Sequence, residues 1–168
     1  MAEKELSFNE FFETMQRIAA DGVSFKDFQN GIFCKRTIVV EDDNLLRENI
    51  IKRFKGSALV SFCAQDYKTA KRLIYPRFQN ASKFMYAIID DRFPEQRGDE
   101  PKCLADKVAD ELLKEHPGIR IFGYFENNNN VDRSKYIDIL RKDIVALDDL
   151  YKIMIKDSET IREEKCQK

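Results

Sequence analysis

Residues 85–98 have the sequence MYAIIDDRFPEQRG. The apolar run at its start has the length of a strand, and a strand buried on both faces is apolar throughout in this way. The run stops at Asp90 and Asp91, and Gly98 closes the polar loop that follows. In open α/β sheets, ligands bind at the edge formed by the carboxyl ends of the strands. We therefore expect the carboxylate of Asp90 to be used chemically.

The segments around this stretch alternate between strand-like and helix-like patterns. Strands are expected at 37–40, 58–64, 84–89, 119–125 and 136–140, and helices at 45–54, 66–75, 103–115 and 146–155. The segment 131–135 is too short for a good helix, so one helix of the regular alternation is expected to be vestigial or to merge into its neighbours, although 132–140 also fits a helical pattern. Five strands alternating with helices predict an α/β fold, a doubly wound five-stranded parallel sheet with helices on both faces.

The N-terminal segment has a different texture from the rest of the chain. Apolar residues recur at helical spacing over 6–20, and a second, shorter helical segment follows at 24–30. Six of the 13 phenylalanines precede residue 34, so these aromatic side chains must be covered. They either pack on the main domain or form a surface for a second copy or a partner. We expect an N-terminal helical extension at 1–35, a main domain at 36–156, and a charged tail at 157–168 that extends the last helix.

Composition excludes several classes of function. Charged residues make up 35% of the chain and the net charge is −1, so no basic surface for nucleic acid is expected. No apolar run is long enough to span a bilayer, and residues 1–5 are too acidic for a signal peptide, so a cytoplasmic protein without membrane contact is expected. The four cysteines form no C-x-x-C pair and should be reduced, and with His116 as the only histidine a structural zinc site is not expected. His116 itself is interpreted as a residue near the last carbonyls of a helix end.

Two strand-like runs end in acids, which are Glu41-Asp42-Asp43 after the first and Asp90-Asp91 after the third. If these strands are neighbours, the carboxylates converge, and such a cluster repels itself unless a hard cation such as Mg²⁺ lies among the oxygens. Lys142, just past the last strand, could reach the same edge. A carboxylate nucleophile, a metal and a lysine together can handle a transferring phosphoryl group. The alternative is that each acidic group only caps a helix or lies in a loop.

From about residue 36 to 156 the chain resembles a response-regulator receiver domain. The segment 39–47, VVEDDNLLR, is similar to the first strand, the acidic pair and the start of the first helix of that family. Asp90, with Pro94 four residues and Gly98 eight residues further on, resembles the phosphoacceptor strand and its loop. Lys142, followed by the helix that opens near 147–150, resembles the lysine and the last helix of the family.

This resemblance implies the strand order 2-1-3-4-5. It also implies Mg²⁺ held by Asp42, Asp90 and the backbone carbonyl of Arg92, with Glu41 acting through water, and Asp90 and Lys142 as the phosphoacceptor and the charge partner of the phosphoryl group. The donor would be a phosphohistidine on a histidine kinase or a histidine phosphotransfer protein. Such a protein at most catalyses its own phosphorylation and dephosphorylation. A homodimer or an output protein would be contacted through the N-terminal helices or the last strand and helix.

The chain departs from the family pattern at two positions. Receivers carry a Ser or Thr at the end of the fourth strand, and residues 118–133 contain neither, whichever of Phe122, Gly123 and Phe125 occupies the position. The proline that usually follows the lysine is Asp143. The hydroxyl belongs to the conformational switch rather than to the phosphorylation chemistry, so these departures concern the relay. Arg92, two residues after the acceptor, is expected to face the site, where it would hinder water or form an ion pair.

Three functions compete at this point. The first is a phosphorylatable receiver in two-component signalling, and the second is a degenerate receiver that acts as a phosphorylation-independent interaction module. The third is a small hydrolase with an aspartyl-phosphate intermediate. Such phosphatases carry a second Asp two residues after the nucleophile, where this chain has Arg92, so the third is disfavoured.

Overall fold

The computed structural model describes residues 35–55, 57, 59–75, 83–126 and 131–166. The helices expected at 6–20 and 24–30 lie outside these residues. Contacts distinguish two units, Met1–Lys35 and Arg36–Lys168, and the second is the one that can be described.

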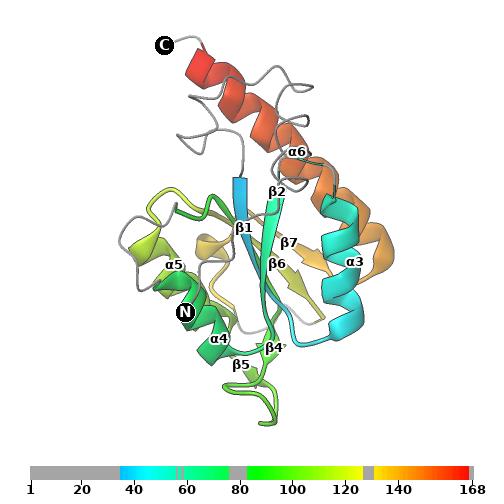
Figure 1. The fold of residues 1–168 in the computed structure, drawn as a ribbon, viewed down its shortest axis with the longest axis vertical. Helices are drawn as coiled ribbons and strands as arrows, with labels where there is room; N and C mark the ends of the chain where they lie inside the picture. The colour runs from blue at the N-terminus through cyan, green and yellow to red at the C-terminus, as the bar shows by residue number, and fades with distance from the viewer. Residues whose placement is uncertain (1–34, 56, 58, 76–82, 127–130, 167–168) are drawn as a thin grey trace, which may run out of the picture. The chain divides into compact units, whose positions relative to one another are not determined.

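The second unit is built on a five-stranded sheet (Figure 1). Its strands are β1 (Lys35–Val40), β2 (Leu59–Ala64), β3 (Tyr86–Ile89), β6 (Arg120–Phe125) and β7 (Asp138–Arg141). They lie in the order β2-β1-β3-β6-β7, and the pairs β1–β3, β3–β6 and β6–β7 are parallel. Counted along the chain without the small hairpin, this is the order 2-1-3-4-5, so the predicted fold class and topology are confirmed.

Two helices cover each face of the sheet. On one face lie α4 (Tyr67–Ile74) and α5 (Ala105–Glu115), and on the other lie α3 (Asn44–Phe54) and α6 (Ile144–Cys166) (Figure 1). Three of these helices, α3, α4 and α6, begin after an aspartate whose side chain satisfies a free N–H group, whereas α5 has no side-chain cap. Asp43 accepts from the N–H of Leu46, and Asp66 accepts from the N–H of Thr69. The four helices predicted between residues 45 and 155 are therefore present, and α6 continues into the charged tail as far as Cys166.

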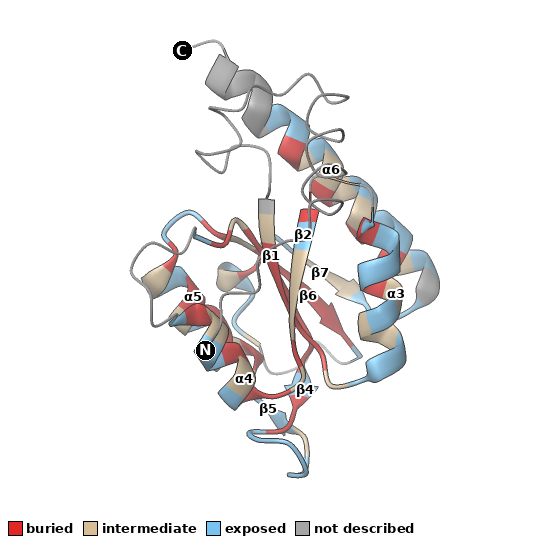
Figure 2. Ribbon diagram, viewed as in Figure 1, coloured by how far each residue is buried: buried red, intermediate tan, exposed pale blue. Residues whose placement is uncertain are grey.

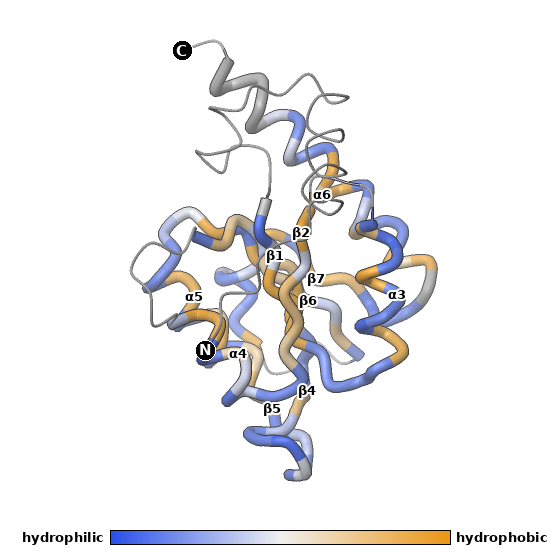
Figure 3. The backbone as a smooth tube through the Cα atoms, viewed as in Figure 1, coloured by the Kyte–Doolittle hydropathy of each residue, from blue (hydrophilic) through white to orange (hydrophobic). Residues whose placement is uncertain are grey.

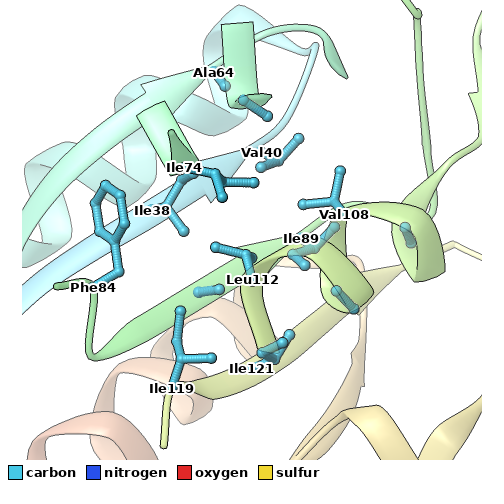
Figure 4. Packing of buried hydrophobic residues seen from close by; sticks show 14 of the residues in the cluster. Ile38, Val40, Ala64, Ile74, Phe84, Ile89, Val108, Leu112, Ile119 and Ile121 are labelled. Atoms are coloured by element: carbon cyan, nitrogen blue, oxygen red, sulfur yellow. The ribbon is translucent and has the colours of Figure 1, made fainter. Parts of the chain in front are cut away.

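Alternate residues of the central strands point into two separate cores. In β3, Ala87 and Ile89 belong to the core under α4 and α5, while Tyr86 and Ile88 belong to the core under α3 and α6. Figure 4 shows the first core, in which Leu112 of α5 lies against the sheet with no exposed surface. Truncating such a side chain to alanine costs about 2–5 kcal/mol. The central strands are buried in Figure 2 and apolar in Figure 3, as expected for strands covered on both faces.

The fourth crossover is short, as the segment 131–135 indicated. Among its described residues it contains one helical element, the 3₁₀ turn η1 (Arg133–Lys135), which is joined to α5 by polar contacts. The Tyr136 hydroxyl donates to Asp106 of α5 at 2.9 Å. The Lys135 ammonium group donates to Asp110 of the same helix, also at 2.9 Å. The helical alternative for 132–140 is wrong, because residues 138–141 form the edge strand β7.

A small hairpin after β3 was not predicted. It consists of β4 (Arg92–Phe93) and β5 (Lys102–Cys103), which pair antiparallel. The carbonyl groups of Pro94 and Glu95 accept hydrogen bonds from the first two N–H groups of α4, each at 3.0 Å. These bonds attach the hairpin to the N-terminus of α4, at the edge of the sheet where β1 and β3 end (Figure 1). Strands of two residues have no periodic pattern that sequence reasoning could detect.

At the other end of the strands, where β3 and β6 begin, α6 and His116 hold the sheet in place. Asp157 of α6 accepts from the Tyr86 hydroxyl at 2.6 Å and pairs with Arg120 at 2.6 Å. His116 ends α5 as expected, but its ring is buried and contacts other elements instead of the carbonyls of its own helix. Its Nδ1 accepts from the Phe84 N–H, and its Nε2 lies 3.2 Å from the Ile74 carbonyl. No helix among the described residues is long and apolar enough to cross a membrane.

Candidate functional site

The carboxyl ends of β1 and β3 lie side by side at one edge of the sheet. Val40 and Ile89, the last residues of these strands, are partners in the parallel register. The next residues are Glu41 and Asp90, so the register brings both carboxylates to the same place. Backbone bonds continue past the strand ends, because the Glu41 N–H donates to the Ala64 carbonyl (3.0 Å) and the Asp90 N–H donates to the Val40 carbonyl (2.9 Å).

Three carboxylates and one ammonium group meet at this edge. Glu41, Asp42 and Asp90 each place an oxygen within 4.8 Å of the other two. Lys142 follows β7, two strands away from β3, and its Nζ donates to Glu41 Oε1 at 3.0 Å and to Asp90 Oδ2 at 2.8 Å. Glu41 and Asp90 are 1% and 3% exposed, so these ion pairs are screened little by water. The four side chains that the sequence singled out are thus neighbours.

The charges in this cluster do not balance. Burial raises the pKa of the Asp90 carboxyl, and the negative charge of Glu41 raises it further. Burial also raises the pKa of Glu41. Burial alone would lower the pKa of Lys142, but its hydrogen bonds and ion pairs with the two acids outweigh that effect and raise it. The cluster therefore favours one more positive charge, either a proton on a carboxyl or a metal cation.

The donor atoms present fit a magnesium ion. Glu41 Oε1 accepts from Lys142 and from the Asp43 N–H, whereas Glu41 Oε2 is buried and has no hydrogen-bond partner among the described residues. A buried carboxylate oxygen without a partner is costly, and a cation or its water would satisfy it. Magnesium prefers a small number of carboxylate oxygens with room left for water.

An open pocket of about 330 Å³ gives access to the acids. It is lined by Asp42, Asp90, Asp91, Arg92, Pro101, Glu126 and Lys142. The hairpin forms one wall, since Arg92 lies in β4 and its guanidinium donates to the Pro101 carbonyl at 3.1 Å. Arg92 therefore lines the pocket, as expected, with its side chain hydrogen-bonded to the hairpin backbone. That its carbonyl is a metal ligand stays a prediction.

Arg47 of α3 holds the acid-bearing loop in place and was not singled out from the sequence. Its guanidinium donates to the carbonyl of Glu41 at 2.7 Å and to the carbonyl of Asp42 at 2.8 Å, and also to Asn44 Oδ1 at 2.9 Å. These bonds fix the backbone from which two of the three carboxylates project. The sequence signal for this role is an arginine in the first turn of the helix that follows an acidic loop, and this signal is weak.

Asp91 links two strand ends. It is 7% exposed, and its Oδ1 accepts from the Glu126 N–H at 3.3 Å, which joins the end of β3 to the end of β6.

The position next to Asp90 on β6 is held by Tyr124. Ile89 pairs with Gly123, so the next residues along the two strands are Asp90 and Tyr124. The position expected to carry the Ser or Thr of the family is the end of the fourth sheet strand, and β6 ends at Phe125, one of the three residues that the sequence offered. The placement of Tyr124 beside Asp90 was not predicted, because the register of neighbouring strands depends on tertiary pairing, which an isolated apolar run does not specify.

Neither a family profile nor a curated protein matches this sequence. Solved structures do match its fold. A CheY-like response regulator receiver domain protein from Methanospirillum hungatei has a TM-score of 0.58 at 18% identity, covering 77% of this chain and 98% of its own. The signal receiver domain of a putative LuxO repressor protein from Vibrio parahaemolyticus has a TM-score of 0.59 at 19% identity, covering 80% and 97%. The response regulator TrrA from Thermotoga maritima, in complex with Mg²⁺ and BeF, has a TM-score of 0.55 at 18% identity, covering 74% and 98%.

This is the response-regulator receiver fold. The resemblance drawn from three short motifs is thereby confirmed at the level of the fold. Within the receiver fold, this chain carries the hairpin β4–β5 after its third sheet strand, and η1 is the one helical element among the described residues between β6 and β7.

Proposed function

We propose that residues 36–156 form a two-component receiver that accepts a phosphoryl group from a phosphohistidine onto Asp90. The observation that carries this proposal is the placement of the Lys142 ammonium group between Glu41 and Asp90, at the mouth of a pocket. A lysine in this position neutralises a carboxylate nucleophile and can then hold the oxygens of an incoming phosphoryl group.

In the proposed reaction, a carboxylate oxygen of Asp90 attacks the phosphorus of the phosphohistidine. The new O–P bond forms as the P–N bond breaks, and the imidazole of the donor leaves with the electron pair of that bond and takes up a proton. Lys142 exchanges part of its contact with Asp90 for the phosphoryl oxygens. The pocket is open, so the donor imidazole and the solvent reach Asp90 from the same side.

Asp42, Asp90 and the Arg92 carbonyl are the groups that we propose to hold Mg²⁺, with Glu41 contacting it through water. When bound, this ion supplies positive charge that offsets the negative charge of the acids and of the transferring oxygens. The unpartnered Glu41 Oε2 supports this assignment.

The partners that follow are a histidine kinase or a histidine phosphotransfer protein in the cytoplasm. For output, we retain the proposal that the N-terminal segment at 1–35 or the surface of β7 and α6 contacts a second copy or another protein.

Intact-mass spectrometry tests the proposal directly. The full chain is treated with acetyl phosphate in the presence of Mg²⁺ or of EDTA, beside the variants Asp90→Asn and Asp110→Asn. We expect a phosphoryl adduct in the wild type and in Asp110→Asn with Mg²⁺, and none with EDTA or in Asp90→Asn. Asp110 is a matched control because it is an aspartate paired with a lysine, Lys135, but on the exposed face of α5. An adduct that persists in Asp90→Asn would refute the assignment of the acceptor.

A second function, a phosphorylation-independent interaction module, is favoured by two observations. Where the connection before β7 is described, at 131–137, its helical structure is the short turn η1, and the Tyr124 hydroxyl donates to the Asp143 carbonyl. Amide spectra with Mg²⁺ and beryllofluoride separate the two functions. Shifts that extend along β6 and β7 support a switching receiver, whereas shifts confined to the pocket, with partner binding unchanged in Asp90→Asn, support the module.

A further inference from the structure

Tyr124 lies beside Asp90 and is directed away from the pocket. It belongs with Phe122 to the core under α3 and α6, and it is 1% exposed. Its hydroxyl donates to the backbone carbonyl of Asp143 at 2.5 Å. A buried phenol needs such a partner, and here the partner is the residue that follows Lys142 in the chain.

Asp143 is the junction between β7 and α6. Its side chain accepts from the Ala146 N–H at 2.7 Å, so it caps the helix. Its carbonyl accepts from the Leu147 N–H at 3.2 Å in addition to the Tyr124 hydroxyl. The carbonyl therefore has both of its lone pairs engaged, one by the first turn of α6 and one by β6.

Lys142 is held from the same strand. Its N–H donates to the Phe125 carbonyl at 2.9 Å. Two consecutive residues of β6, Tyr124 and Phe125, thus bind two consecutive residues of the junction, Asp143 and Lys142. The lysine side chain has a flexible four-carbon stem, so the place of its ammonium group depends on how firmly this backbone is held.

We propose that Tyr124 is a positioning residue for Lys142. Its hydroxyl fixes the Asp143 carbonyl, which fixes the Lys142 backbone so that the ammonium group bridges Glu41 and Asp90. The effect of Tyr124 on phosphoryl transfer rests on the proposed function, whereas its effect on the position of the Lys142 ammonium group does not. In this chain the hydroxyl beside the acceptor is a phenol that supports the lysine.

The test compares Tyr124→Phe with Tyr86→Phe. Both tyrosines are buried in the same core, and each loses one hydroxyl bond, but the Tyr86 hydroxyl contacts Asp157 at the opposite edge of the sheet. The first measurement is the ammonium resonance of Lys142 in ¹⁵N-labelled full-length protein, assigned by its loss in Lys142→Met. We expect exchange of its protons with water to be faster by about five- to tenfold in Tyr124→Phe, which is the worth of one neutral hydrogen bond, and unchanged in Tyr86→Phe.

The second measurement is the rate of phosphorylation against acetyl phosphate concentration. We expect the limiting rate of Tyr124→Phe to fall about five- to tenfold, with the half-saturating concentration unchanged, because Lys142 acts on the transferring group. The inference would be overturned if Tyr124→Phe kept the ammonium exchange rate and the limiting phosphorylation rate of the wild type. It would also be overturned if Tyr86→Phe changed both rates as much as Tyr124→Phe does. A wild type that takes up no phosphoryl group would refute the proposed function alone, because ammonium exchange would still decide the role of Tyr124.

Discussion

Replacing Asp90 by asparagine should stabilise the fold while it abolishes phosphorylation. The substitution removes one of three negative charges and keeps the shape of the side chain. The amide oxygen can still accept from Lys142, whose Nζ lies 2.8 Å from Asp90 Oδ2. The change therefore isolates the cost of a buried charge from the loss of packing.

The expected gain follows from the distances. At an effective dielectric constant of about 20, the Lys142 ammonium at 2.8 Å attracts the Asp90 carboxylate by about 6 kcal/mol. Glu41 and Asp42, with oxygens within 4.8 Å, each repel it by about 3.5 kcal/mol. Attraction and repulsion nearly cancel, which leaves the cost of removing the charge from water. We expect Asp90→Asn to raise the free energy of unfolding by about 1–3 kcal/mol near neutral pH without divalent cations.

The gain should depend on pH. The pKa of Asp90 is raised above its ordinary 3.8, so above that pH the folded protein binds a proton that the unfolded chain has released. The contribution of Asp90 to the free energy of unfolding of the wild type is therefore largest below pH 3.8 and is lost as the pH rises. The asparagine of the variant does not titrate and adds no such dependence. The stability difference between variant and wild type should widen from about pH 5 to about pH 8.

Urea unfolding followed by circular dichroism measures this difference, with Asp110→Asn as the control for loss of a surface carboxylate. With Mg²⁺ at about a hundred times its dissociation constant, the wild type should gain about 2.7 kcal/mol and the variant much less, so the difference should close. Equal stability of wild type and Asp90→Asn at both pH values, or an equal response of both to Mg²⁺, would refute the reasoning.

Three further predictions concern other charged groups. Lys142→Met should lower the free energy of unfolding by about 3 kcal/mol in urea, because it leaves two buried carboxylates without their partner, and should abolish the phosphoryl adduct in the mass spectrum. Burial holds the pKa of His116 below its ordinary 6.5, so the stability from its neutral ring is present above that pH and is lost as the pH falls; His116→Gln should flatten the acid limb of a plot of thermal midpoint against pH. Asp157→Asn should cost about 1.5–3 kcal/mol, since it weakens two contacts, with Tyr86 and Arg120; a midpoint shift no larger than that of Asp110→Asn would contradict it.

Local patterns in the sequence determined the elements and their order. The apolar run before Asp90, the acids after the first strand and the lysine after the last strand predicted a parallel sheet with charged groups at its carboxyl edge. These inferences succeeded because hydrophobic periodicity and the geometry of parallel strands depend on residues close together in the chain. For the same reason the length of 131–135 sufficed to predict that this segment holds no full helix.

Tertiary structure decided the contacts that make the cluster a site. The sequence could not place Tyr124 beside Asp90, because a shift of one residue in strand register moves every side chain to the other face. Nor could it show that Arg47 holds the loop that carries Glu41, or that the Tyr124 hydroxyl binds the Asp143 carbonyl, since these bonds join residues whose proximity exists only once the sheet has formed. The chemical role of the acids could be predicted from the sequence. The contacts that hold these acids and Lys142 in position form only in the folded protein.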